Sequence, residues 1–360
     1  MQKARDVSNP IANRRSFLKG GALAASAATV GAGALISDVS AQNRDRDDGP
    51  LSPGDAAILR FLTAAEIIES DLWQQYNELG GVNGGSQPYI NALLQLDGDM
   101  PQYITDNTDD EISHENFLNA YLQMRGAHQV DLDMFRNLPS SKATGAKQIG
   151  RLTNLMNLTV DTSWWTRYRS ETNPDLGAKF PQVVNIVNRP AIPRNDAELS
   201  DSNHVQAIAN TAGFHFAFIE QGGTSLYTTM ARKVSSLEVL RIVTSIGGTE
   251  IAHFQTWHDK AGNAPPLTDN TGNPVTFPDF TLPPFNGETF QKNKIMPEPC
   301  QFISPHLPLC SIIRPTNTEG IAKGAVTALT NDGLFIGQSA QFFAYLKELA
   351  EEADAARRRG

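Results

Sequence analysis

The stretch Glu250-Ile251-Ala252-His253 decides the fold, together with its counterpart Glu111-Ile112-Ser113-His114. Both lie in segments whose apolar residues recur at helical spacing. A helix brings residues i and i+3 onto one face, roughly 5–6 Å apart at Cβ. Each Glu-x-x-His step therefore presents a carboxylate and an imidazole in one direction. We infer two pairs of metal ligands, each carried by its own helix.

A lone glutamate lies in a helical segment upstream of each step, so the order is Glu, Glu-x-x-His, Glu, Glu-x-x-His. Four carboxylates and two imidazoles on four helices are the ligand set of a carboxylate-bridged di-iron or di-manganese centre in a four-helix bundle. We expect two divalent ions about 3.5–4 Å apart. The candidate metal ligands are Glu66, Glu111, His114, Glu220, Glu250 and His253.

The predicted helices carry capping signals. Ser52 and Pro53 suit an N-cap and a first turn. Asp109-Asp110 are interpreted as the cap of the second helix, and Gly262 with Pro265-Pro266 ends the fourth. The four helices are predicted over residues 52–79, 110–136, 204–234 and 237–261.

The remaining segments are expected to be largely irregular. Residues 82–108 form a loop or partial helix, and residues 262–315, which hold 11 of the 21 prolines, form an extended strap with short strands. A last helix is predicted over about 338–358. The fold class is all-α: a four-helix bundle over 52–261, with a long crossover insertion at 137–203 and a Pro-rich C-terminal extension, 262–360.

Several other residues are alternative ligands or could contact the six candidates. Glu69 shares a helix stripe with Glu66, and Glu115 follows His114 directly, so both are alternative ligands. Tyr227 and Trp73 each lie seven residues after a ligand glutamate; they are interpreted as core, with contact to the ligands as the alternative. The other histidines are expected to be structural or exposed: His128, His204, His215, His258 and His306.

The N-terminus is typical of an export signal. Asn13-Arg14-Arg15-Ser16-Phe17-Leu18-Lys19 is a twin-arginine motif, and a weakly apolar run leads to a small-residue cleavage site at Val39-Ser40-Ala41. The run is shorter than about 20 residues and rich in glycine, which favours a signal peptide over a transmembrane helix. We expect a signal over 1–41, a disordered linker over 42–51 and no membrane span in the mature form.

That signal implies the twin-arginine export machinery as a partner and a periplasmic or extracellular location. The full chain has a net charge of −9, and its basic signal region makes the mature part more acidic still. Such a protein is a poor partner for nucleic acid. The two cysteines, Cys300 and Cys310, could form a disulfide in an oxidising compartment, with two unpaired thiols as the alternative.

The chain resembles bacterial ferritin-like proteins that carry twin-arginine signals, and desiccation-related proteins are similar. The resembling pieces are residues 66–73, residues 218–227 and residues 250–253. The resemblance implies a ferritin-like four-helix bundle with metal positions at the six candidates. The middle insertion and the Pro-rich tail depart from the family's pattern, so the resemblance carries no inference about cage assembly.

These observations predict an exported ferritin-like protein that binds two Fe or Mn ions. Both metals cycle between +2 and +3, so oxidase or peroxide-dismutating activity is expected if the protein is an enzyme. The alternative is a non-catalytic stress or envelope protein of the desiccation-related type. A homo-oligomer is compatible with either interpretation.

Overall fold

The computed structural model describes residues 49–167, 181–285, 306 and 319–358. The chain divides into two units, residues 1–47 and 48–360, and every described residue lies in the second. The predicted signal peptide and the Cys300–Cys310 pair lie outside the described residues. Within the described part, no helix combines the length and the apolar character that crossing a membrane requires.

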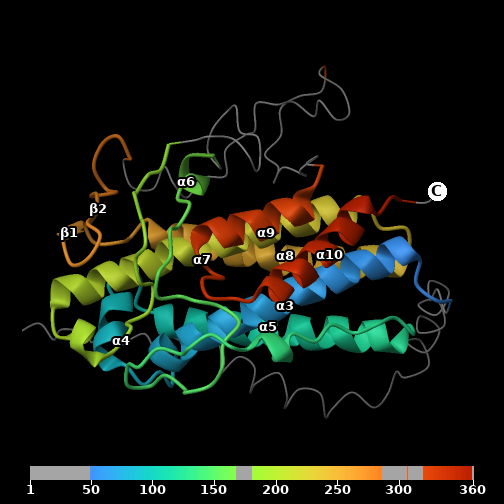
Figure 1. Ribbon diagram of the computed structural model, residues 1–360. Coiled ribbons are helices and arrows are strands. Elements are labelled where there is room, and N and C mark those ends of the chain that lie inside the picture. Colours follow the sequence, from blue (N-terminus) through green and yellow to red (C-terminus); the bar gives the residue numbers. More distant parts are fainter. Residues whose placement is uncertain (1–48, 168–180, 286–305, 307–318, 359–360) are drawn as a thin grey trace, which may run out of the picture. The chain divides into compact units, whose positions relative to one another are not determined.

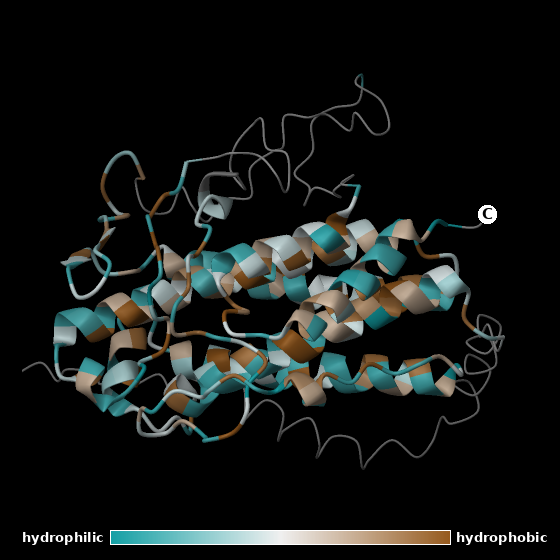
Figure 2. Cartoon of the chain, viewed as in Figure 1, coloured by the Kyte–Doolittle hydropathy of each residue, from teal (hydrophilic) through white to brown (hydrophobic). Residues whose placement is uncertain are grey.

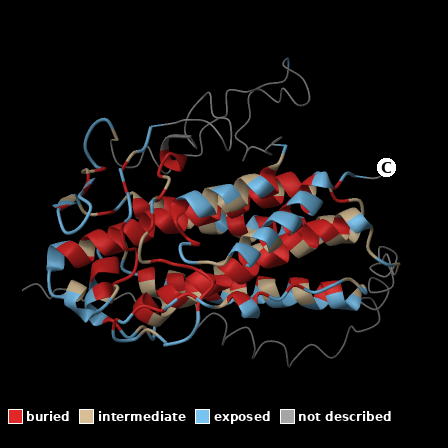
Figure 3. Cartoon of the chain, in the orientation of Figure 1, coloured by how far each residue is buried: buried red, intermediate tan, exposed pale blue. Residues whose placement is uncertain are grey.

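Four long helices form the core of this unit (Figure 1). Helix α3 packs along α5, and α7 packs along α8. Apolar residues recur along all four helices (Figure 2). Buried residues form a stripe on one side of α5 and of α8, whereas most residues of α7 are buried (Figure 3). The prediction of an all-α four-helix fold is confirmed. The four helices are α3 (Pro53–Gly80), α5 (Met100–Met124), α7 (Ser202–Ala231) and α8 (Leu237–Ala261).

Shorter elements complete the unit. The C-terminal helix α10 packs on α3, and α9 packs on α10 and α7. The two strands pair antiparallel, with Leu267 opposite Phe277. The short elements are α4 (Gln87–Leu93), α6 (Trp164–Arg167), β1 (Leu267–Asp269), β2 (Val275–Phe277), α9 (Ile321–Asp332), α10 (Ala340–Ala355) and the 3-10 turns Asp133–Phe135 and Asp196–Leu199.

The second long helix differs from its prediction. It begins at Met100 and ends at Met124, so Asp109-Asp110 lie in its interior and are not its cap. Pro101 stands in the first turn, where its missing N–H and fixed φ suit a helix start. Gly126 has a φ of +69°, the left-handed conformation that commonly follows a helix end. The crossover therefore spans residues 125–201.

The segments before and after the four-helix bundle also differ from expectation. Helix α9 was not predicted, and it adds a second helix to the C-terminal extension. At the other end, the Arg125 guanidinium donates to the Gly49 carbonyl at 3.1 Å, so the end of the expected linker is bound to the bundle. The first helix starts as predicted, with Ser52 Oγ accepting from the Asp55 N–H at 3.0 Å.

Asp71 ties the crossover to α3. Its carboxylate accepts the backbone N–H groups of Leu152 and Thr153, both at 3.0 Å, and the Thr153 hydroxyl at 2.7 Å. Arg136 completes the set with an ion pair at 2.8 Å. A buried carboxylate with this many donors holds two chain segments in one geometry.

We predict that Asp71→Asn lowers the free energy of unfolding by about 2–4 kcal/mol, because the amide places its own N–H group among buried donors and removes a buried charge pair. Asp133→Asn is the matched control: Asp133 pairs with the same Arg136, but its side chain is 79 % exposed. It should cost less than about 0.5 kcal/mol. Urea unfolding measures both, and equal effects would contradict the anchoring role.

Candidate metal centre

The six predicted residues meet between the four long helices. Helix α3 contributes Glu66, and α7 contributes Glu220; α5 and α8 each contribute a Glu-x-x-His step. All four glutamates have an exposed fraction of 0 %. The two imidazoles, His114 and His253, are slightly more accessible, with side chains 10 % and 11 % exposed. We call these six residues the centre.

The centre consists of two overlapping groups. In each group, one ligand atom from every member lies within 4.8 Å of the others. Glu111 and Glu250 belong to both groups, so the two positions share two carboxylates. The first group is Glu66, Glu111, His114 and Glu250, and the second is Glu111, Glu220, Glu250 and His253.

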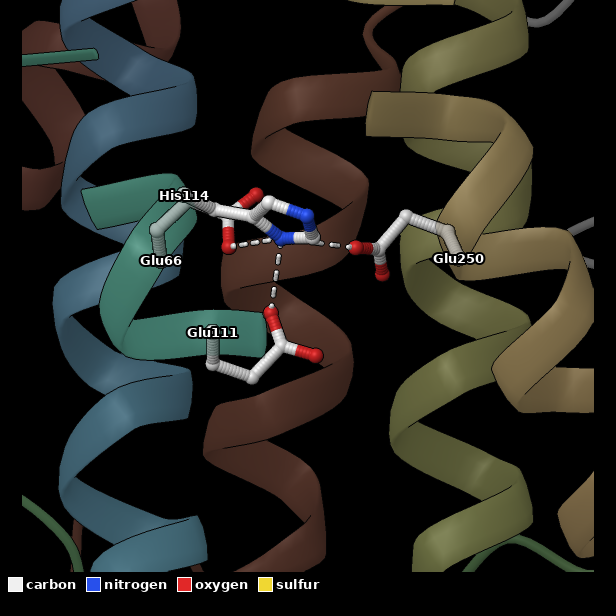
Figure 4. A group of neighbouring side chains, drawn as sticks. All are labelled: Glu66, Glu111, His114 and Glu250. Carbon is white, nitrogen blue, oxygen red and sulfur yellow. Dashed lines mark hydrogen bonds and ion pairs between the residues drawn. The ribbon is translucent and has the colours of Figure 1, made fainter. Parts of the chain in front are cut away.

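Each imidazole points a nitrogen into its group. His114 Nδ1 lies 3.3 Å from Glu66 Oε2, 3.2 Å from Glu111 Oε2 and 3.5 Å from Glu250 Oε1 (Figure 4). His253 Nδ1 lies 3.1 Å from Glu111 Oε1 and 3.3 Å from Glu220 Oε2. Both Nδ1 atoms are thus surrounded by carboxylate oxygens, the arrangement that a shared cation would produce.

Several of these inward atoms form no hydrogen bond within the described part of the chain. Both oxygens of Glu250 are among them, although a buried polar atom without a partner costs roughly 1–3 kcal/mol. Metal coordination would satisfy all of these atoms together, so the donor set fits a bound metal. The five atoms are Glu66 Oε2, Glu220 Oε2, Glu250 Oε1, Glu250 Oε2 and His253 Nδ1.

Asn107 is a buried contact of the centre that the sequence did not reveal. Its Nδ2 donates to Glu111 Oε1 at 2.8 Å and to Glu220 Oε1 at 3.0 Å, and its Oδ1 accepts from Trp257 Nε1 at 2.7 Å. It lies one helical turn before Glu111. The predicted start of the second helix near residue 110 placed Asn107 in a loop, which hid this i, i+4 relation.

Two further residues orient ligands from outside the centre. The Tyr227 hydroxyl donates to Glu66 Oε1, so this tyrosine is both core and a ligand contact. Asp110 Oδ2 lies 3.1 Å from His253 Nε2. A carboxylate on the outer nitrogen fixes the tautomer that leaves Nδ1 free to bind a metal. The sequence favours a helix cap at Asp110, but Asp110 lies inside α5 and contacts His253.

Glycines let α7 and α8 approach each other closely beside the centre. A Cβ on Gly223 would lie 2.2 Å from Glu250 Oε2, and one on Gly247 would lie 2.8 Å from Tyr227 Cβ. Neither position can take a side chain unless its neighbour moves. The space for the Glu250 carboxylate therefore depends on glycine at position 223.

The charges of the centre shift several pKa values. Burial, followed by the charge of Glu220, raises the pKa of Glu111 to about 7. Burial and the nearby carboxylates, Glu111 first, raise the pKa of Glu250 well above its ordinary value. Burial opposes the charged form of His114, but the adjacent carboxylates of Glu111 and Glu66 raise its pKa to about 10. Without metal, the centre therefore binds protons in place of cations.

The competing residues lie outside both groups. Glu69 is half-buried near the centre, and burial followed by the charge of Glu111 raises its pKa well above the ordinary value. Glu115 is half-buried as well, and Trp73 is core, stacked on Trp257 with ring centroids 5.3 Å apart.

The remaining histidines that were expected to be structural or exposed lie elsewhere. His204 pairs with Asp269 and His215 with Asp332 and Tyr76, while His128 is exposed. His258 is buried against Trp164 and Trp165.

Comparison with known proteins agrees with this architecture. Residues 54–262 match the model of a family described as a ferritin-like domain, and this range contains the whole centre and all four long helices except the first residue of α3. Searches of curated proteins and of solved structures gave no match. Because the matched range covers more than half of the chain, the protein belongs to the ferritin-like domain family.

Proposed function

We propose that the centre binds two divalent metal ions, Fe or Mn, and that the metal-loaded protein is an oxidoreductase acting on oxygen or peroxide. The observation that carries this proposal is the pair of overlapping groups sharing Glu111 and Glu250. One ion would take Glu66 and His114 as its own ligands, and the other would take Glu220 and His253. Glu111 and Glu250 would serve both ions.

The composition of the donor set supports Fe or Mn. Four carboxylates balance the four positive charges of two divalent ions, so a loaded centre is close to neutral and suits a buried position. Carboxylate and imidazole ligands without thiolate favour these metals over a structural zinc site. Fe or Mn bound here would supply one-electron steps between the +2 and +3 states.

The protein's own residues would hold this donor set in place. Tyr227 restrains Glu66, and Asp110 orients His253. Asn107 donates to one shared and one unshared glutamate, which links the two groups. The 0 % exposure of the glutamates keeps bulk water away from the carboxylates.

We further propose that the protein works in the periplasm or outside the cell after twin-arginine export. The Arg14-Arg15 motif and the small-residue site ending at Ala41 support this location. Since that pathway carries folded proteins, a centre loaded before export would be retained.

The shared and unshared glutamates make the two-ion arrangement testable. We predict that the wild type binds about two equivalents of Mn²⁺ or Fe²⁺, that Glu66→Gln binds about one, and that Glu250→Gln binds fewer than one, because Glu250, unlike Glu66, serves both positions. Glu69→Gln, outside both groups, is the matched control and should keep two. Elemental analysis after dialysis measures the ratio, and equal losses in Glu66→Gln and Glu250→Gln would contradict shared ligation.

Turnover tests the redox assignment. The Mn-loaded protein should release oxygen from peroxide, or the Fe-loaded protein should consume oxygen while Fe²⁺ is oxidised. Glu220→Ala should abolish either activity, because it removes one position's own carboxylate. A loaded protein that shows neither activity, yet melts at a lower temperature after chelation, would overturn the enzymatic assignment and support a structural role.

Proton binding predicts how the metal-free protein responds to pH. The pKa of Glu111 rises from 4.5 to about 7, so the folded state holds more protons than the unfolded chain between these values. Stability must therefore fall as pH increases through this window. The pKa of His114 rises from 6.5 to about 10, and its contribution is present below 6.5 and is lost as pH rises through 10. Both groups act in the same direction.

We therefore predict that the metal-free protein melts about 5 °C lower at pH 8.5 than at pH 5.5. Thermal unfolding followed by circular dichroism measures the difference. Glu111→Gln should show a smaller change, because it removes one of the titrating groups. A melting temperature that stays constant or rises over this range would mean that the carboxylates do not converge.

A further inference from the structure

A cavity of about 750 Å³ adjoins the centre. Its walls come from α3, α7, α9 and the crossover, and we call it the α9 cavity. Its volume lies within the range of about 300–1,000 Å³ that is usual for small-molecule sites. Helix α9 lies beyond residue 262, where the ferritin-like match ends. The cavity is therefore built partly from segments that this chain adds to the four helices.

Two residues connect the α9 cavity with the centre. Gly223 lines the cavity, and a Cβ at this position would lie 2.2 Å from Glu250 Oε2. Gly223 therefore borders the cavity and also lies next to a shared carboxylate. Glu69 lines the cavity as well, three residues after Glu66 on the same helix.

The lining indicates what the α9 cavity would accept. Apolar side chains and glycines make up most of the wall, including Phe218 and Leu226 of α7 and Leu329 of α9. No lysine, arginine or histidine occurs among the described lining residues, and the charged ones are all acidic. An anion would meet repulsion there, and a cation would lose hydration against a mainly apolar wall.

We infer that the α9 cavity binds a small, uncharged organic molecule with a mainly apolar surface, at a position next to Glu250. Oxygen and peroxide need far less space than this cavity offers. The role of the bound molecule as a reactant rests on the proposed function, whereas its binding does not require metal.

Two glycines on different helices line the cavity and allow it to be filled without replacing a residue of the centre. A Cβ on Gly222 of α7 or on Gly324 of α9 would have no heavy atom within 4 Å. Because both glycines line the cavity, the side chains of Gly222→Leu and Gly324→Leu are expected to occupy part of it, and leucine favours a helix more than glycine does. Gly248→Leu is the matched control, since Gly248 on α8 has the same open surroundings but lies outside the cavity lining.

The probes are three fluorinated aromatics of similar size: uncharged 4-fluorophenol, anionic 4-fluorobenzoate and cationic 4-fluorobenzylammonium. Fluorine NMR of the metal-free full-length protein near pH 7 measures binding. We expect saturable binding of 4-fluorophenol, at least about tenfold weaker in both cavity-filling variants and unchanged in Gly248→Leu. Melting temperatures confirm that each variant is folded, and two variants on different helices guard against a folding failure in one.

Three results would overturn the inference. The first is equal binding of 4-fluorophenol by the wild type and the filled variants, which would place the probe elsewhere, such as the second cavity beside Arg60 and Arg125. The second is tighter binding of either charged probe. The third is an absence of extra line broadening in protein shown to contain Mn²⁺, because this ion broadens nearby fluorine signals steeply with decreasing distance. Failure to bind Mn²⁺ would count against the proposed function alone, since the metal-free titration tests the cavity by itself.

Discussion

Four carboxyl groups without solvent exposure must be neutralised where they lie, and much of the bundle is arranged around this requirement. Each ionised carboxylate removed from water costs several kcal/mol unless a charge or hydrogen bond replaces the water. Two imidazoles, one asparagine amide and one tyrosine hydroxyl provide part of that replacement. The atoms that remain without a hydrogen bond are directed toward one another, which is the physical reason to place cations there.

An aromatic layer closes one side of this polar interior. Trp73, Phe216 and Trp257 pack against each other with ring centroids 4.7–5.3 Å apart, and they come from α3, α7 and α8. Trp257 also donates to Asn107, so the apolar core fixes the amide that contacts Glu111 and Glu220. Packing and ligand geometry are therefore coupled, and a change in one aromatic side chain would be transmitted to two carboxylates.

Most of the centre could be predicted from the sequence because its spacing is local. A Glu-x-x-His step fixes two ligands on one helix face whatever the fold around it. Contacts across the bundle carry no such signal. Tyr227 contacts Glu66 from another helix. Asn107 was not identified as a contact, because the prediction placed the start of the helix at Asp109-Asp110. The residues that mark the two ends of α5 are Pro101 and Gly126. Pro101 precedes the predicted helix start, and Gly126 precedes the predicted helix end at residue 136.

The C-terminal extension shows the same limit. Proline content suggested an extended segment with short strands over residues 262–315; in its described part, residues 262–285, a hairpin is present at β1 and β2. Helix α9 was missed since its own sequence holds an internal glycine and two threonines, which favour a helix weakly. Its stability comes from packing on α10 and α7, and packing partners distant in the chain are not visible in a local pattern.

The division of the centre between two helix pairs has a consequence for folding. The pair α3–α5 contributes Glu66, Glu111 and His114, so it holds three of the four members of the first group; α7–α8 holds three of the four members of the second. Each pair consists of neighbouring helices, whereas joining the pairs requires closure of the crossover, an entropic cost that local pairing does not bear. We expect the two hairpins to form early and to dock late. An ion bound by one hairpin would then lack one carboxylate of its group, and the other hairpin would supply that carboxylate. Metal binding would therefore favour the docking of the two hairpins.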